Sequence, residues 1–274
     1  MIKIIRKNIS EALSKTTDAE LFAILNSSRN TCWKTGEGYG ISLRFCDIRT
    51  PSEKEDIVYI VLDREHLVFL SENQRVLSCV NENRNGEDAM GLHDFFTELI
   101  DEDMDILDDL ETRILSIEGE LLDGQNPGKS VLIEIMELKH GVLRIKRYYE
   151  QLEMICETLS ENENDVFSEK MEERFRILAT KIDHLHQNAL HLYECLTQVR
   201  EVYQAQIDIQ QNNVMKMFTV ITTIFFPLTL ITGWYGMNLK MPEFSWNLGY
   251  LFVIFLSLGI IVLSIGIFKK KKWF

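Results

Sequence analysis

The fold is decided by the stretch Thr232-Gly233-Trp234-Tyr235-Gly236-Met237-Asn238, which ends a long uncharged segment of this 274-residue chain. No charged residue occurs from Met217 to Leu239, and none occurs from Phe244 to Phe268. Each segment exceeds the roughly 20 residues that a helix needs to cross the hydrocarbon core of a bilayer. Both are too long and too uniformly apolar for the core of a soluble domain. The sequence therefore predicts two transmembrane helices, with Gly236, Met237 and Asn238 where the first one leaves the membrane.

Charges around these segments predict their orientation. Lys269 to Lys272 follow the second segment directly, which places the C-terminus in the cytoplasm by the positive-inside rule. Met1 to Lys7 is too short an apolar stretch for a signal peptide, so we expect the large polar part to stay in the cytoplasm too. This predicts a multi-pass protein of the cell (inner) membrane, in contact with lipid, with both termini cytoplasmic. The link from Gly236 to Glu243 then faces outward.

Composition and motifs argue against two classes of function, nucleic-acid binding and enzymatic catalysis. The formal net charge is −13, and we expect no nucleic acid partner. No convergent nucleophile–base set and no phosphate loop occurs, so we do not expect an enzyme. The glycines of Gly36-Glu37-Gly38-Tyr39-Gly40 are interpreted as a turn, because Ile41 replaces the third glycine of a dinucleotide fingerprint. The five cysteines are scattered, which indicates reduced thiols rather than a disulfide framework.

Residues 1–90 are predicted to form a cytoplasmic α/β domain. A helix is expected at Glu20 to Asn26. Short β-rich runs separated by turn-like polar residues predict strands. These runs are Ile2 to Arg6, Ile41 to Arg44, Ile57 to Leu62, His66 to Leu70 and Val76 to Val80.

Residues 91–165 are predicted to form an acidic cytoplasmic helical hairpin. Apolar residues recur at helical spacing from Gly91 to Leu122, with strongly acidic residues between them. The segment Gly124 to Gly128 ends this helix, and a second helix is expected from about Ser130 to Leu159.

Residues 166–238 are predicted to form a stalk helix that continues into the first transmembrane helix. From Val166 onward the sequence has no glycine or proline until Pro227. A helix this long does not stand alone in water, so we expect an oligomer whose stalk helices pack together. Residues 239–246 then form a short outer loop, and residues 247–274 form the second transmembrane helix and the basic tail.

One face of the first transmembrane helix carries small and polar residues at steps of three or four. They are Asn212, Met215, Phe218 or Thr219, Thr222, Phe226, Thr229 and Gly233. Such a stripe is typical of helix–helix packing, which favours Thr and Gly, and equally of a water-filled channel lining. In the second helix, Ser257, Ser264, Gly259 and Gly266 favour packing, with the helix as a lipid-facing wall.

The outer end of the first helix suits a cation. Its unpaired carbonyl groups carry partial negative charge, and Asn238 adds a neutral side-chain oxygen. Because Mg²⁺ dehydrates reluctantly, a ring of neutral oxygens would hold it through its water shell.

At this point the sequence resembles the CorA family of divalent-cation transporters. The resemblance is carried by Tyr235-Gly236-Met237-Asn238, Met241-Pro242-Glu243, Asn212-Asn213-Val214-Met215-Lys216, Phe225-Phe226-Pro227-Leu228-Thr229 and the lysine tail. It implies a funnel-shaped homopentameric Mg²⁺ channel. By matched position, Gly236 and Asn238 resemble the outer selectivity site, and Thr229 and Gly233 resemble hydrated-ion positions. Met215, Phe218, Thr222 and Phe226 resemble the hydrophobic constriction, and Asn212 the inner polar ring.

The resemblance also implies closure by cytosolic Mg²⁺ bound between subunits. Asp101, Asp105 and Asp108 in the acidic helix are the candidate regulatory ligands. The family's regulatory carboxylate on the stalk falls nearest to Ile177, which cannot ligate, and Asp183 or Glu173 is a substitute.

Several departures and alternatives accompany this hypothesis. Phe218 and Phe226 are bulkier than is common at these positions, and Lys240 replaces an outer acid. One alternative is a Co²⁺, Ni²⁺ or Zn²⁺ transporter of the same fold, and another is a membrane module that senses divalent cations without conducting. His184, His191 and Cys195 share a helical face and form a weaker candidate site for a softer metal.

Overall fold

The computed structural model of the chain describes residues 2–5, 31–35, 38–51, 55–62, 67–82, 88–123, 128–238 and 247–270. The predicted helix at Glu20 to Asn26 and the predicted outer loop, residues 239–246, lie outside these ranges. The chain divides into two compact units, Met1–Tyr203 and Gln204–Phe274.

The first unit contains one five-stranded sheet in the order β1-β5-β4-β3-β2. β1 pairs parallel with β5, and the other neighbours are antiparallel. The register places Ile41 of β3 opposite Ile60 of β4, and Ile60 opposite Phe69 of β5, so apolar residues line up across the sheet. The strands are β1 (Ile2–Ile5), β2 (Cys32–Thr35), β3 (Gly38–Phe45), β4 (Asp56–Leu62) and β5 (Leu67–Leu70).

The glycine-rich piece is not simply a turn. Gly38 and Gly40 belong to strand β3, and Gly40 pairs with Trp33 of β2. A Cβ atom added at Gly40 would lie 2.5 Å from the Trp33 indole ring. Glycine is therefore required at this position by the close approach of the ring.

The prediction of a strand at Val76 to Val80 is wrong. Helix α3 spans Gln74–Glu82. The side-chain oxygen of Asn73 accepts hydrogen bonds from the backbone N–H groups of Arg75, at 2.9 Å, and Val76, at 3.3 Å, which caps the helix. Val76, Cys79 and Val80 are buried at helical spacing.

The prediction of a single helix from Gly91 to Leu122 is also wrong. The segment forms α4 (Asp88–Leu99) and α5 (Asp103–Leu122). Between them, the Ile100 N–H donates to the Thr97 carbonyl at 3.3 Å and the Asp103 N–H to the Ile100 carbonyl at 3.2 Å. These tighter bonds replace the α-helical pattern and turn the chain.

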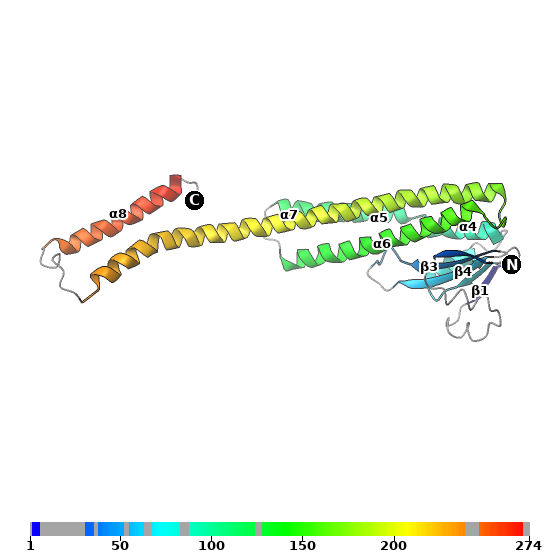
Figure 1. The fold of residues 1–274 in the computed structure, drawn as a ribbon, viewed down its shortest axis with the longest axis horizontal. Helices are drawn as coiled ribbons and strands as arrows, with labels where there is room; N and C mark the ends of the chain where they lie inside the picture. The colour runs from blue at the N-terminus through cyan, green and yellow to red at the C-terminus, as the bar shows by residue number, and fades with distance from the viewer. Residues whose placement is uncertain are drawn as a thin grey trace. The chain divides into compact units, whose positions relative to one another are not determined.

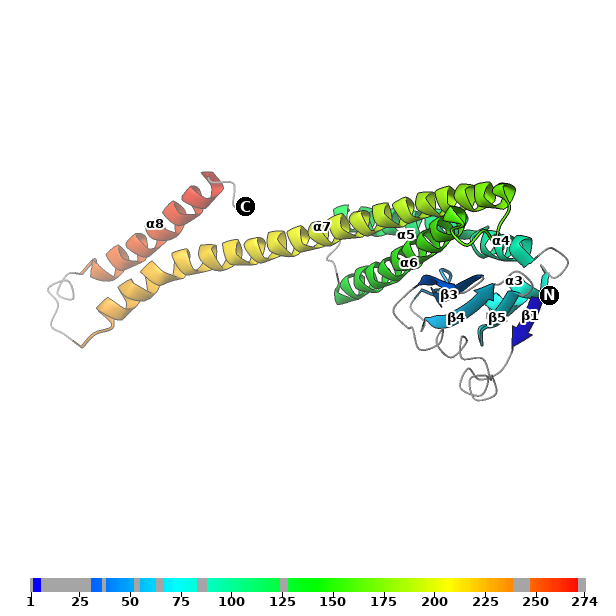
Figure 2. The same ribbon diagram turned by 45° about the vertical axis from the view of Figure 1, so that its right-hand side comes forward.

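Helices cover the sheet of the first unit (Figure 2). α6 (Lys129–Glu161) contacts β2 and β3, and α4 contacts β5. Aromatic rings fill the contact: Phe69 lies 4.8 Å from Phe95, and Phe45 meets Tyr148 edge-on at 5.9 Å between centroids. The helix predicted from about Ser130 to Leu159 is thus present as α6, and it packs on the sheet.

The turn between α6 and α7 is organised by Asn162. This residue is buried and left-handed, with φ 44°. Its Oδ1 accepts from the N–H groups of Val166, at 2.9 Å, and Phe167, at 3.0 Å, and its Nδ2 donates to the Phe167 carbonyl and to Glu172. A single amide therefore satisfies both sides of the turn.

Helix α7 spans Glu169–Tyr235, 67 residues, as the absence of glycine and early proline predicts (Figure 1). Its last part and α8 (Gly249–Lys270) make up the described helices of the second unit. Both are long and apolar enough to cross a membrane.

Candidate ion pathway

The predicted pore-lining residues all lie on α7 and are all exposed in the single chain. We call this set the α7 stripe; it comprises Asn212, Met215, Phe218, Thr222, Phe226, Thr229 and Gly233. The exposed fraction reaches 73% for Phe226 and 57% for Phe218. Large apolar side chains this open require a partner, which is either lipid or another protein surface.

The opposite face of α7 is the one that is covered within the second unit. Lower exposure recurs there at helical spacing, at Lys216, Val220, Ile224, Pro227, Ile231 and Tyr235, with Val220 only 9% exposed. At 3.6 residues per turn, this face lies roughly 180° around the helix from the α7 stripe. Packing against the rest of its own unit therefore does not account for the stripe.

Helix α8 presents one matching face. Its less exposed residues are Val253, Ser257, Ile260, Ile261, Ser264 and Phe268. Gly259 and Gly266 lie outside this face, and a Cβ atom added at either would meet nothing within 4 Å. The packing expected from small residues thus applies to the two serines and does not extend to the two glycines within this chain.

The threonine hydroxyls of this face are bonded to the helix itself. Thr229 donates to the Phe225 carbonyl at 2.9 Å, and Thr222 donates to the Phe218 carbonyl. Thr219, the alternative stripe position, donates to the Met215 carbonyl at 2.7 Å. Each hydroxyl directs its proton at a backbone carbonyl, so the lone pairs of its oxygen remain as neutral acceptors on an exposed side chain.

Helix α7 ends immediately before the predicted filter. The Gly236 N–H donates to the Thr232 carbonyl at 2.9 Å, and the Met237 N–H donates to the Trp234 carbonyl at 3.3 Å. A Cβ atom at Gly236 would lie 2.8 Å from the Thr232 carbonyl oxygen. Gly236, Met237 and Asn238 are all exposed. A groove of about 430 Å³ beside them is lined by Phe226, Thr229, Leu230, Gly233, Trp234 and Met237.

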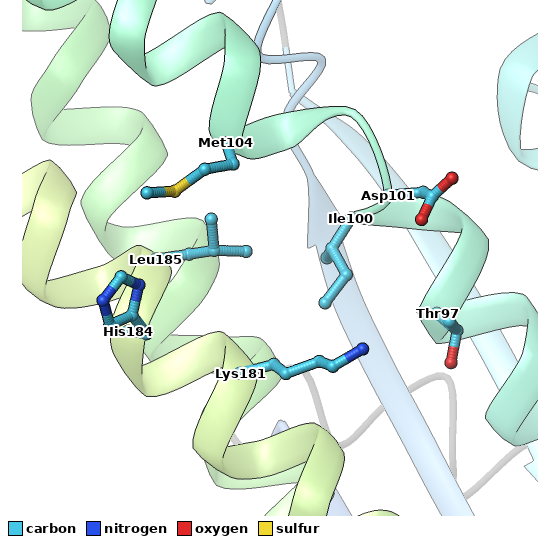
Figure 3. Close-up of a pocket in the computed structure, with 7 residues that line it drawn as sticks. All are labelled: Thr97, Ile100, Asp101, Met104, Lys181, His184 and Leu185. Carbon is cyan, nitrogen blue, oxygen red and sulfur yellow. The ribbon is translucent and has the colours of Figure 1, made fainter.

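The predicted regulatory acids lie in the first unit. Asp101 is in the break between α4 and α5, and Asp105 and Asp108 are on α5; all three are exposed. Asp101 lines a pocket of about 260 Å³ into which Lys181 extends from α7 (Figure 3). The positive charge of Lys181 in this pocket would oppose the binding of a metal ion at Asp101. The neighbouring Asp103, in contrast, is buried.

The structure brings some of the other stalk candidates together and separates others. Glu173 forms an ion pair with Arg176, and His184 lies in the Lys181 pocket. Cys195 Sγ is 3.6 Å from His191 Nε2. Asp183 instead converges with Glu153 and His186, a group that sequence reasoning missed. The i, i+3 spacing of Asp183 and His186 was a signal, but Glu153 comes from another helix.

Comparisons with known proteins agree with this architecture. Residues 6–270 match the sequence profile of the CorA-like Mg²⁺ transporter protein family. The chain is 28% identical over 183 residues to the cobalt/magnesium transport protein CorA of Thermotoga maritima, covering 66% of this chain and 52% of that protein. It is 26% identical over 221 residues to the magnesium transport protein CorA of Wolinella succinogenes, covering 80% and 67%. The matches thus span about half to two thirds of these relatives.

The fold has a solved counterpart. The complete structure of the CorA magnesium transporter from Methanocaldococcus jannaschii superimposes with a TM-score of 0.79 at 18% identity, covering 97% of this chain and 86% of that one. The predicted α/β domain, long helix and C-terminal apolar helix are confirmed. With the profile matching nearly the whole length, the chain belongs to the family of CorA-like Mg²⁺ transporter proteins.

Proposed function

We propose that this chain forms a homopentameric channel that carries Mg²⁺ into the cell through the cytoplasmic membrane. The main support is that the α7 stripe faces away from the covered side of its helix. Copies that meet through this exposed face would bring the stripes around one axis, with the α8 helices outside. Family membership supports the same arrangement. Both termini are cytoplasmic in this proposal.

The chemistry of the stripe suits a hydrated cation. Water bound to Mg²⁺ points its hydrogens outward, so a pathway that passes the hydrated ion needs acceptors. The hydroxyl lone pairs of Thr222 and Thr229 are such acceptors, since their protons are held by backbone carbonyls. Neutral acceptors bind weakly enough to release the ion to the next site.

Gly236, Met237 and Asn238 form the outer filter in this proposal. Gly236 lets the backbone pass within van der Waals distance of the Thr232 carbonyl, and Asn238 follows as an exposed amide. The end of α7 adds the partial negative charge of its last carbonyls. An inside-negative potential of 100 mV would contribute about 4.6 kcal/mol to the entry of a divalent ion.

Closure is assigned to Phe218 and Phe226 with Met215, which place apolar side chains on the stripe. Cytosolic Mg²⁺ bound between subunits, with Asp101, Asp105 and Asp108 as candidate ligands, would favour the closed arrangement. All three carboxylates are exposed in the single chain, which leaves them available to a neighbouring copy.

Mg²⁺ flux into proteoliposomes, with internal Mg²⁺ varied, tests conduction and feedback together. We expect uptake that falls as internal Mg²⁺ rises, and a loss of at least about tenfold in Asn238→Ala, because a filter oxygen is removed. Absence of flux, or flux unchanged in Asn238→Ala, contradicts the proposal. Electrical recording in divalent-free solution separates a closed channel from a module that senses without conducting.

The relative from Thermotoga maritima is named a cobalt/magnesium transport protein, which favours Co²⁺ as a second cargo. Competition of Co²⁺, Ni²⁺ and Zn²⁺ against Mg²⁺ flux would rank the cargo ions. If excess Co²⁺, Ni²⁺ or Zn²⁺ reduces Mg²⁺ flux only weakly, the pathway prefers Mg²⁺. This result would support the leading proposal, because the stripe offers oxygen ligands.

A further inference from the structure

A cluster of three potential metal ligands lies in the first unit, whereas the residues of the α7 stripe belong to the second. Glu153 comes from α6, and Asp183 and His186 come from consecutive turns of α7. Each offers one ligand atom, and these atoms all lie within 4.8 Å of one another. The cluster thus joins α6 to α7 through Glu153 and His186, which are 33 residues apart in sequence.

The local geometry matches a shared ion. His186 Nδ1 lies 3.1 Å from Glu153 Oε2. That separation fits a hydrogen bond, and it equally fits two atoms that bind one metal at about 2.0–2.2 Å. Gln187 Nε2 donates to Asp183 Oδ1 at 3.2 Å, which holds this second carboxylate in place from outside the cluster.

The charge of the cluster favours a cation. Among the described residues, no lysine or arginine forms an ion pair with Glu153 or Asp183. A protonated His186 would neutralise one carboxylate and leave the other, whereas a divalent ion neutralises both. Leu152 and Ile182, each adjacent in sequence to a ligand, are fully buried, so the charge lies beside a low-dielectric layer.

A second observation concerns the imidazole of His186. Its Nε2 is buried and has no hydrogen-bond partner among the residues that the structure describes. When Nδ1 binds the ion, Nε2 on the opposite edge of the ring keeps the proton, and a water molecule would accept its hydrogen bond. The side chains of His186 and Glu153 are 16% and 24% exposed, which leaves a path for an ion and for a water ligand.

We propose that Glu153, Asp183 and His186 form a binding site within one subunit for a borderline divalent cation such as Zn²⁺ or Co²⁺. A mixed nitrogen and oxygen ligand set selects these ions over Mg²⁺, which prefers oxygen alone. Three protein ligands leave a fourth position for water. The bound ion ties α6 to α7. The proposal does not depend on conduction through the α7 stripe.

The test uses the purified full-length protein in detergent micelles, stripped of metal by a chelator. Co²⁺ is added in excess Mg²⁺, and binding is followed by its visible d–d absorption and by titration calorimetry. We expect one Co²⁺ per chain. Glu153→Gln, Asp183→Asn and His186→Asn should each weaken binding on the order of 10–100-fold. Glu153→Gln keeps a hydrogen-bond acceptor for His186, so the fold is retained, and circular dichroism checks this.

Matched controls come from one of the two helices. Glu157→Gln and His140→Asn, both on α6, should bind Co²⁺ as the wild type does. Asn238→Ala should also retain the absorption band, which separates this site from the filter. Co²⁺ affinity that is unchanged in Glu153→Gln and His186→Asn overturns the proposal, and so does displacement of Co²⁺ by equimolar Mg²⁺. Either result would mean that His186 and Glu153 contact each other without binding a metal ion.

Discussion

The hydroxyl of Tyr149 donates a 3.0 Å hydrogen bond to the carboxylate of Asp103, which is only 1% exposed. Burial raises the pKa of Asp103 to about 6, although the bond from Tyr149 acts in the opposite direction. Between pH about 4 and 6 the folded chain therefore keeps a proton that the unfolded chain releases. The stabilisation from this proton is complete below pH 4 and is lost as the pH rises to 6.

Replacing Asp103 by Asn should stabilise the protein at neutral pH. The amide oxygen still accepts the Tyr149 hydrogen bond, and the cost of burying a charge disappears. A pKa displacement of about two units corresponds to about 3 kcal/mol in the free energy of unfolding. We expect this gain at pH 7 and almost none at pH 4, measured by denaturant unfolding in micelles. An equal difference at both pH values would show that the charge of Asp103 is not the cause.

Gly40→Ala should destabilise the sheet. The new Cβ would lie 2.5 Å from the Trp33 ring and would force the indole off strand β3. Overpacking of this kind costs about 1–3 kcal/mol. Gly119→Ala on α5 is the control, because a Cβ there meets nothing within 4 Å, and it should stabilise by up to about 1 kcal/mol. Thermal unfolding distinguishes the two; equal shifts would refute the steric explanation.

Asn162→Ala should loosen the turn between α6 and α7. The substitution removes four side-chain hydrogen bonds and leaves the N–H groups of Val166 and Phe167 without their acceptor. The expected loss in the free energy of unfolding is about 2–4 kcal/mol. Asn162→Gly tolerates φ 44° but makes no side-chain bonds, so it should recover only part of the loss. Full recovery would assign the effect to backbone strain alone.

Gly236→Ala should reduce Mg²⁺ flux at least about tenfold under the proposed function. Its Cβ would meet the Thr232 carbonyl oxygen at 2.8 Å, so the backbone at the proposed filter must move. Gly259→Ala on α8 adds the same methyl group where nothing lies within 4 Å, and its flux should match the wild type. Equal flux in both variants would show that conduction does not depend on the backbone position of Gly236.

Helical periodicity and apolar length predicted the elements that depend on local sequence. The long α7 and the apolar α8 follow from the spacing of glycine, proline and charge, and β4 follows from its run of β-branched residues. The prediction of a strand at Val76 to Val80 was wrong because it ignored the helix-capping residue before this segment. Asn73 was the available signal, since its side chain starts α3.

The remaining features depend on contacts between distant segments. No residue between α4 and α5 is a glycine or proline, and the break accompanies the burial of Asp103 against Tyr149 on another helix. The cluster of Glu153 with His186 is likewise invisible in the sequence, because only the packing of α6 on α7 brings them together. The α7 stripe could be recognised in the sequence because its residues recur at steps of three or four. Its position opposite the covered face could be recognised only in the structure.

The bonded threonines of α7 have a consequence for anions. A chloride or phosphate ion gives up its hydration only to groups that donate hydrogen bonds. Thr219, Thr222 and Thr229 have already donated to backbone carbonyls, so these hydroxyls have nothing to offer such an ion. In the proposed pathway, these threonines would therefore favour cations over anions without carrying a charge.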